Sequence, residues 1–406
     1  MIKRMKDHMK THTKEKLTTI LFVLLVFSLM IGMLFHVKEI GGEFIVSYRM
    51  NVLPETPLLK RVSGAISAMD SSINAGVPAR PQFIETYGLA QLLMNKKIVI
   101  DPNYGALYKT PYGQIVYAVE EKYLPVYLEP TYELTNTLAM QEIPLLYVQA
   151  PFKLPDAHSQ VPLTVTDYSN KNVDEFLAGL TAASVSCFDL RPILSGSGMT
   201  QNQLFYNTDH HWTIDAALFA TREIVKKLNA DYGFEIDESN YEISQFDRKT
   251  WPNFYIGSMG RRVGRIYGGL DDFTLITPKY ETNFSVTEDG AFYAEGSFED
   301  AILKKEYIDE QATLDTNRYA VYHGDNAELI FENHMVSKGK ILVIKDSFGI
   351  PVYSFLALGV HEVRAVDVRL FEEDVAEYAI KYNPDIVLLL YNADCFTDQM
   401  FDFKTK

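Results

Sequence analysis

The sequence predicts an α/β protein in which helices cover both faces of a parallel β-sheet, preceded by one membrane-spanning helix. In the C-terminal part, short runs of continuously apolar residues alternate with helical patterns. Such runs are typical of parallel strands that are buried on both faces. A longer uncharged run near the N-terminus predicts the spanning helix. With 406 residues, 47% of them hydrophobic and 22% charged, the chain is large and apolar enough to fold.

The predicted membrane helix extends from Leu17 to Val37 and contains no Lys, Arg, Asp or Glu. A helix of 21 residues is about 31 Å long, which matches a hydrocarbon core of about 30 Å. Six basic residues precede it, so the positive-inside rule predicts a cytoplasmic N-terminus and an outward location for residues 40–406. No small-x-small cleavage site follows the run, which favours a signal anchor over a cleaved signal peptide.

The chain divides into four predicted segments. They are a basic cytoplasmic tail (1–16), a transmembrane signal anchor (17–37), a juxtamembrane stalk (38–77) and an extracytoplasmic domain (78–406). Residues 230–330 interrupt the alternation of strands and helices and are rich in Tyr, Phe, Gly and charge. We therefore expect an inserted, β-leaning subregion or lid there.

The elements of the domain follow from periodicity and turn residues. In its first half we expect a helix and strand over 78–101, strands around Gly113, a strand over 143–151, a helix over 172–184, a strand over 185–190 and a helix over 213–229. Thr213 can cap the last helix, and Asp215 lies in its positive first turn. In the second half we expect strands over 340–346, 361–368 and 384–392, with helices over 350–359 and 371–383 between them.

Charge and cysteine content exclude two classes of function. The net charge is -15, and residues 1–38 carry +5, so the remainder carries about -20. An acidic body of this kind repels nucleic acid phosphates. Cys187 and Cys395 have no zinc-ligand spacing, which argues against a structural zinc site. A disulfide between them stays open.

Polar side chains follow three of the predicted parallel strands, where functional groups of open α/β sheets gather. Ser347 follows the first strand, Asp367 and Arg369 follow the second, and Asn392 follows the third. Ser347 is also followed directly by a predicted helix, whose positive N-terminal end would face a developing oxyanion. Asn392 is a candidate side-chain donor to the same oxyanion.

A second polar cluster, Asp209-His210-His211-Trp212, lies directly before the predicted helix over 213–229. A serine hydroxyl needs a base to become nucleophilic, and a histidine oriented by a carboxylate supplies one. The simpler interpretation is a capped helix start with an aromatic plug. Spacing does not decide between them, so we predict, rather than deduce, that this cluster meets Ser347.

The stretches "YNTDHHWT" and "VIKDSFG" resemble the DHHW protein family of bacteria, over roughly residues 80–400. That family is similar to the alginate O-acetyltransferase proteins, which have an SGNH-hydrolase-like fold. The resemblance implies that Asp209 is the triad acid, His211 the base and Ser347 the nucleophile. His210 fills the variable position of the motif and Trp212 matches its aromatic residue. Lys345 departs from the pattern, because it replaces the glycine of the SGNH Gly-Asp-Ser block.

The resemblance implies a membrane-anchored extracytoplasmic O-acyltransferase, or an esterase, that acts on a cell-surface polysaccharide without a cofactor. It also implies a membrane-bound O-acyltransferase as the partner that passes the acyl group outward. We expect His210, Trp212, Arg369 and Asn392 to contact the substrate or the oxyanion.

Two alternatives stay open. The departure at Lys345 allows a non-catalytic envelope protein that binds glycan or scaffolds the acyltransferase. A metal site is the other alternative, with Asp209, His210 or His211 joined by His323 or His361. Histidines at adjacent positions rarely point to one ion on a regular element, so we expect no metal.

Overall fold

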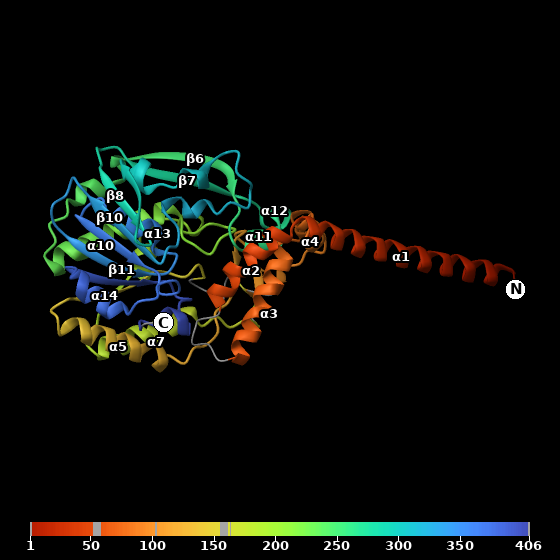
Figure 1. Ribbon diagram of the computed structural model, residues 1–406, viewed down its shortest axis with the longest axis horizontal. Coiled ribbons are helices and arrows are strands. Elements are labelled where there is room, and N and C mark those ends of the chain that lie inside the picture. The colour runs from red at the N-terminus through yellow and green to blue at the C-terminus, as the bar shows by residue number, and fades with distance from the viewer. Residues whose placement is uncertain (1, 52–57, 102–103, 155–160, 163, 405–406) are drawn as a thin grey trace. The chain divides into compact units, whose positions relative to one another are not determined.

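The computed structural model describes residues 2–51, 58–101, 104–154, 161–162 and 164–404 (Figure 1). The chain forms two compact units, Met1–Ile84 and Glu85–Lys406. Helix α4 (Arg80–Leu93) contains the boundary between them, a few residues beyond the predicted boundary at residue 78.

The N-terminal unit is helical. Helix α1 (Ile2–Phe35) is followed by α2 (Val37–Asn51) and α3 (Leu58–Ala75). Within α1, Lys14–Phe35 has a mean hydropathy of 2.6 and none of it is buried, so this helix is long and apolar enough to cross a membrane. The predicted apolar helix is therefore confirmed, although the basic tail and the apolar run form one continuous helix. The predicted stalk consists largely of the helices α2 and α3.

The second unit contains an eight-stranded sheet with the strand order β5-β4-β13-β11-β12-β10-β8-β9. The bounds are β4 Leu145–Gln149, β5 Ser186–Asp189, β8 Phe284–Glu288, β9 Ala291–Gly296, β10 Glu328–Asn333, β11 Lys340–Lys345, β12 Glu362–Val366 and β13 Ile386–Tyr391. The first five strands of that order are parallel, as predicted. The last three pair antiparallel, so the α/β fold is confirmed but the sheet is mixed rather than wholly parallel.

Helices cover both faces of this sheet. Helices α10 (Ile214–Tyr232) and α13 (Gly349–Leu356) lie on one face, and α5 (Pro125–Ala139), α7 (Ser169–Ala182) and α14 (Val375–Tyr382) on the other (Figure 1). Successive residues of β11 alternate between the two cores: Ile341 and Val343 pack in the first, Leu342 and Ile344 in the second. Because both faces of the strand are buried, its apolar run is continuous.

Helix α10 begins and ends as the sequence predicts. The Thr213 hydroxyl accepts a hydrogen bond from the Ala216 N–H at 3.2 Å, and Asp215 lies in the first turn. Gly233 ends the helix in the left-handed conformation, with a φ of 71°. The N-terminal cap at Thr213 therefore fixes where the helix begins, directly after the 209–212 segment.

Residues 230–330 are rich in strands, as predicted, but they form two different structures. Strands β6 (Phe246–Tyr255) and β7 (Asp271–Pro278) make a separate two-stranded ribbon, with the short helices α11 (Gly260–Val263) and α12 (Arg265–Gly268) between them. Strands β8 and β9 instead extend the main sheet. Only part of the region is therefore separate from the central sheet.

The remaining elements are short. Strands β1 (Ile98–Asp101), β2 (Gly105–Lys109) and β3 (Ile115–Val116) form a three-stranded antiparallel sheet, and α8 (Leu190–Ser195) and α9 (Gln201–Leu204) precede the 209–212 segment. Cys187 and Cys395 are both free thiols, which answers the open question about a disulfide.

Candidate active site

The structure brings together the two predicted halves of the site. Ser347 lies between β11 and α13, and its Oγ is 2.7 Å from Nε2 of His211. On the other side of the ring, Nδ1 of His211 is 2.6 Å from Oδ1 of Asp209. An ionised carboxylate only accepts hydrogen bonds, so Nδ1–H of His211 donates to it and Nε2 is free to accept from the Ser347 hydroxyl.

The Asp209 carboxylate is held by donors on both oxygens. Its Oδ1 also accepts from the His211 N–H at 3.0 Å. Its Oδ2 accepts from the Tyr255 hydroxyl and from the Ser258 N–H, each at 2.7 Å. Burial alone would raise the pKa of Asp209, but His211 and His210, together with these hydrogen bonds, hold that pKa well below its usual range. Asp209 is therefore ionised beside the imidazole.

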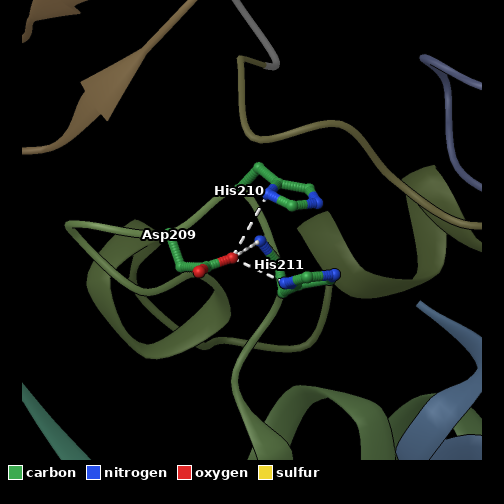
Figure 2. Close-up of side chains that lie close together, drawn as sticks. All are labelled: Asp209, His210 and His211. Carbon is green, nitrogen blue, oxygen red and sulfur yellow. Dashed lines mark hydrogen bonds and ion pairs between the residues drawn. The ribbon is translucent and has the colours of Figure 1, made fainter. Parts of the chain in front are cut away.

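His210 is the more accessible of the two histidines. Its side chain is 21% exposed, against 7% for His211. Figure 2 shows both rings directing Nδ1 towards Asp209, and Nδ1 of His210 also lies 3.0 Å from Oγ of Ser258. Burial, with a further contribution from His211, lowers the pKa of His210 to about 3. The ring is thus neutral near pH 7 and partly exposed, and its contact with substrate stays a prediction.

Asp209, His210 and His211 also form a group whose candidate metal-ligand atoms all lie within 4.8 Å of one another. Both histidine rings turn towards one carboxylate (Figure 2). The expectation that adjacent histidines rarely point to one ion applies to a regular element, whereas residues 209–211 lie in a bend. Coordination would nevertheless displace the hydrogen bond between His211 and Asp209. His323 and His361 do not belong to the group: Nδ1 of His323 lies 2.8 Å from the Ile302 carbonyl, and Nδ1 of His361 lies 3.0 Å from the Val336 carbonyl. The bonding pattern favours proton transfer over metal binding.

Trp212 ties the histidine segment to the serine turn. Its side chain is fully buried, and its Nε1–H donates to the Tyr319 hydroxyl at 3.0 Å and to the Phe348 carbonyl at 3.2 Å. The Tyr319 ring in turn stacks on His211, with ring centroids 4.1 Å apart and planes 12° apart. The prediction that Trp212 contacts substrate is wrong, because the indole is fully buried and supports the site from the core.

Asp346 joins the ends of two strands next to Ser347. Its Oδ2 accepts from the backbone N–H of Asn392 at 2.6 Å and from Nδ2 of Asn392 at 2.8 Å, while its Oδ1 accepts from the Phe348 N–H at 2.8 Å. Burial raises the pKa of Asp346 to about 6. The bond to Asp346 uses one of the two N–H groups of the Asn392 amide. Donation of the other N–H group of this amide to an oxyanion stays a prediction.

Lys345, the departure from the SGNH pattern, belongs to an ion cluster. Its side chain is fully buried and pairs with Asp325 and, at 3.0 Å, with Asp367. Burial alone would lower the pKa of Lys345, but these two carboxylates raise it. Arg369, whose side chain is 33% exposed, pairs with Asp367 through Nε at 2.8 Å. The ammonium is thus neutralised within the cluster, and a substrate contact by Arg369 stays a prediction.

Four buried residues around Asp209, His211 and Ser347 were not predicted to lie there. They are Lys153, Tyr255, Asp271 and Tyr319. Their partners are backbone groups or side chains far away in the chain, so periodicity and motif spacing do not reveal them. The one available signal is that Lys153 and Asp271 are charged residues within otherwise apolar or glycine-rich stretches, "APFKLP" and "GGLDDF".

Comparison with known proteins supports the resemblance seen in the sequence. Residues 115–252 match the family described as the SGNH hydrolase-like domain of the acetyltransferase AlgX. Bacillus cereus PatB1 has a similar structure, with a TM-score of 0.59 and 22% identity, covering 76% of this chain and 99% of that chain. PatB1 with a sulfonyl adduct gives a TM-score of 0.60 and 21% identity over the same shares.

A DHHW family protein from Eubacterium siraeum is also similar, with a TM-score of 0.57 and 14% identity, over 76% of this chain and 98% of that chain. Among curated protein sequences, none matches the chain. The predicted resemblance and the SGNH-like fold are therefore confirmed. The matched family segment includes Asp209 and His211 but ends before Ser347.

Proposed function

We propose that this chain, which resembles the SGNH-hydrolase-like acetyltransferases in sequence and fold, is a membrane-anchored O-acyltransferase that acts outside the cell on a surface polysaccharide. The acyl group is most simply acetyl. The observation that carries the proposal is the continuous chain of hydrogen bonds from Ser347 through His211 to Asp209. In this chain, Ser347 and His211 are in contact although they are 136 positions apart in the sequence. A serine, a histidine and an ionised aspartate in this order are the groups that acyl transfer requires.

The proposed reaction has two steps. In the first, Oγ of Ser347 attacks the acyl carbonyl of the donor while Nε2 of His211 takes the hydroxyl proton. The leaving group of the donor then takes that proton from His211, and an acyl-serine ester remains. In the second, His211 takes the proton of a sugar hydroxyl, which attacks the ester, and Ser347 recovers its proton. Asp209 stabilises the imidazolium in both steps.

Anchoring and partner are part of the same proposal. The apolar helix Lys14–Phe35 supports a single membrane span, and the basic residues before it support a cytoplasmic N-terminus. With that orientation, the second unit lies outside the cell, where no acyl-CoA is available. A membrane-bound O-acyltransferase that passes the acyl group outward, as the family resemblance implies, would supply the donor.

Labelling of the full chain with a fluorophosphonate tests the nucleophile. We expect the wild type to be labelled, and both Ser347→Ala and His211→Ala to lose labelling. Ser337→Ala is the matched control, because Ser337 is an exposed serine in the loop before β11. Equal labelling of Ser347→Ala and the wild type would refute the role of Ser347.

Acyl transfer is distinguished from hydrolysis by the acceptor. The full chain is incubated with an activated acetyl ester, with and without a soluble oligosaccharide, and the products are analysed by mass spectrometry. A transferase yields an acetylated sugar, and the acceptor raises the rate at which the acyl-serine is consumed. Acetate alone, at an unchanged rate, would indicate an esterase that uses the same residues.

The contacts of Lys345 support the catalytic proposal over the non-catalytic alternative. That alternative depended on Lys345 in place of the SGNH glycine, and the Lys345 side chain bonds Asp325 and Asp367 rather than Ser347, His211 or Asp209. A folded wild type that resists the fluorophosphonate and still binds glycan would restore that alternative.

A further inference from the structure

A buried lysine holds the chain at the catalytic aspartate. The Lys153 side chain is 1% exposed, and its Nζ lies 2.7 Å from the Ile115 carbonyl and 2.8 Å from the carbonyls of Asn207 and Asp209. An ammonium has three N–H donors, so all of them are used on backbone oxygens. Two of these three bonds fall on the segment that carries the triad acid.

A buried aspartate accepts hydrogen bonds from backbone N–H groups of the same segment. Asp271, the first residue of β7, is 4% exposed. Its Oδ1 accepts from the Asn207 N–H at 2.6 Å, and its Oδ2 accepts from the Thr208 N–H at 2.8 Å and from the Thr208 hydroxyl at 2.5 Å. The carbonyls of Asn207 and Asp209 thus bond a cation, and the N–H groups of Asn207 and Thr208 bond an anion.

We propose that Lys153 and Asp271 are positioning residues that fix the backbone of residues 207–209 and thereby set the hydrogen bond between Asp209 and His211. This inference rests on the proposed acyl transfer for its functional meaning. Lys153 and Asp271 bond the 207–209 segment instead of the Ser347 hydroxyl or the imidazole of His211, so they act through the backbone. Misplacement of a catalytic group by about 1 Å can cost about 100-fold in rate.

The cost of burying these two charges supports a specific role. Burial lowers the pKa of Lys153 to about 7, against the opposing effect of Asp271 and Asp209. Burial also raises the pKa of Asp271, against its hydrogen bonds with Thr208 and Asn207. Apolar side chains would fill the same space without this penalty, but they would leave the backbone groups of the segment without partners.

The segment held in this way also positions the turn that completes the site. The Thr208 hydroxyl accepts from the Gly257 N–H, and the Thr208 carbonyl accepts from the Gly260 N–H, each at 2.8 Å. Ser258, within that turn, donates its N–H to Asp209. Greater mobility of residues 207–209 is therefore expected to displace Asp209 itself and also the groups that donate hydrogen bonds to its carboxylate.

The test compares Lys153→Met and Asp271→Asn with two controls in the full chain, solubilised in detergent. Lys338→Met removes a lysine that is 83% exposed, and Asp272→Asn changes the exposed neighbour of Asp271. The first measurement is the low-field proton NMR signal of His211 Nδ1–H, which reports its hydrogen bond to Asp209 directly. We expect this signal to shift or disappear in both test variants and to persist in both controls.

The second measurement is catalysis. We expect the rate of fluorophosphonate labelling to fall by about 10-fold to 100-fold in each test variant. For an activated ester, kcat should fall while KM stays within about 2-fold, because neither residue is placed at the ester. The double variant Lys153→Met/Asp271→Asn should lose little beyond the worse single variant, since both residues hold one segment.

The outcomes separate this inference from the proposed function. Folded test variants with the wild-type proton signal and labelling rate would overturn the inference. A wild type that shows the signal but is never labelled, with the signal lost in the test variants, would refute the proposed function and leave the positioning role standing. If Lys153→Met does not fold, Asp271→Asn decides. If neither folds, hydrogen exchange of the wild type decides, and unprotected amides at Asn207 and Thr208 would overturn the inference.

Discussion

Among single residues, Asp209 shows how much support one carboxylate receives in this site. It accepts from two groups of His211, from the Tyr255 hydroxyl and from the Ser258 N–H. Charged hydrogen bonds of this kind are stronger than neutral ones. They keep Asp209 ionised and hold it in one orientation, so the imidazole of His211 keeps a single tautomer.

Loss of the Tyr255 hydroxyl should therefore weaken catalysis. We expect Tyr255→Phe to slow fluorophosphonate labelling by about 10-fold to 150-fold, because a hydrogen bond to a charged group contributes about 1.5–3 kcal/mol. Tyr280→Phe is the control, since Tyr280 is a partly buried tyrosine remote from Asp209. An unchanged rate in Tyr255→Phe would mean that the remaining donors suffice.

The neutral His210 ring should make stability depend on pH. Its pKa is about 3 in the folded protein, against about 6.5 in the unfolded chain. Between these values the unfolded chain binds the proton and the folded chain does not, so the free energy of unfolding falls as the pH falls from 6.5 to 3. We expect His210→Gln to lose less stability than the wild type between pH 7 and pH 4, by about 3 kcal/mol.

Urea denaturation of the full chain at both pH values measures this difference. The exposed His334 supplies the control His334→Gln. Identical losses in the wild type and in His210→Gln would contradict the assignment of a low pKa to His210.

The sequence predicts those site residues whose residue types alone indicate a chemical role. Asp209, His211 and Ser347 form a recognisable set, and the structure places them in contact. Lys153 and Asp271 could not be predicted, because they bond backbone groups and any residue sequence supplies those. Trp212 stands out because the chain has 2 tryptophans, but its predicted contact with substrate is wrong. The sequence does not reveal whether an aromatic ring faces the cavity or the core.

At the level of elements, the turn from Gly257 to Gly260 is built against the triad acid. A Cβ at Gly257 would overlap the Asp209 side chain, and a Cβ at Gly260 would meet Thr208. The ends of β6 and α11 therefore approach the site closely only because these positions lack side chains. Close approach is what allows the Ser258 N–H to reach Asp209.

A methyl group at residue 257 should displace the triad acid. We expect Gly257→Ala to reduce fluorophosphonate labelling by about 100-fold, because a shift of about 1 Å at a catalytic group costs this much. Gly42→Ala in helix α2 is the control, since a Cβ at Gly42 meets nothing within 4 Å. Far-ultraviolet circular dichroism should be the same for both variants, and full labelling of Gly257→Ala would show that the turn can yield.

The predictability of the elements follows from their burial. Strands β4, β11 and β13 were predicted because both of their faces are buried and their residues are continuously apolar. Strand β10 was missed, because buried and part-buried residues alternate along it. The β8–β9 hairpin had a usable signal in Asp289-Gly290, both with positive φ, a typical two-residue turn.

For the whole molecule, the orientation of the proposed membrane helix is the property with the largest consequence. A cysteine introduced as Ser337→Cys should react with a membrane-impermeant maleimide in intact cells, because the proposal places the second unit outside. Burial raises the pKa of Cys187 to about 11 and raises that of Cys395 as well, so the native thiols contribute little background. Labelling that appears only after the cells are lysed would place this unit in the cytoplasm instead.

The order of the strands has a consequence for synthesis. Strand β13 follows both β4 and β11 in the chain, but in the sheet it inserts between them. A nascent chain that already carries the histidine and the serine therefore still lacks the strand that joins their two halves of the sheet. The contact between His211 and Ser347 should therefore form only after β13 has been made, so a nascent chain that lacks β13 should not be labelled by the fluorophosphonate.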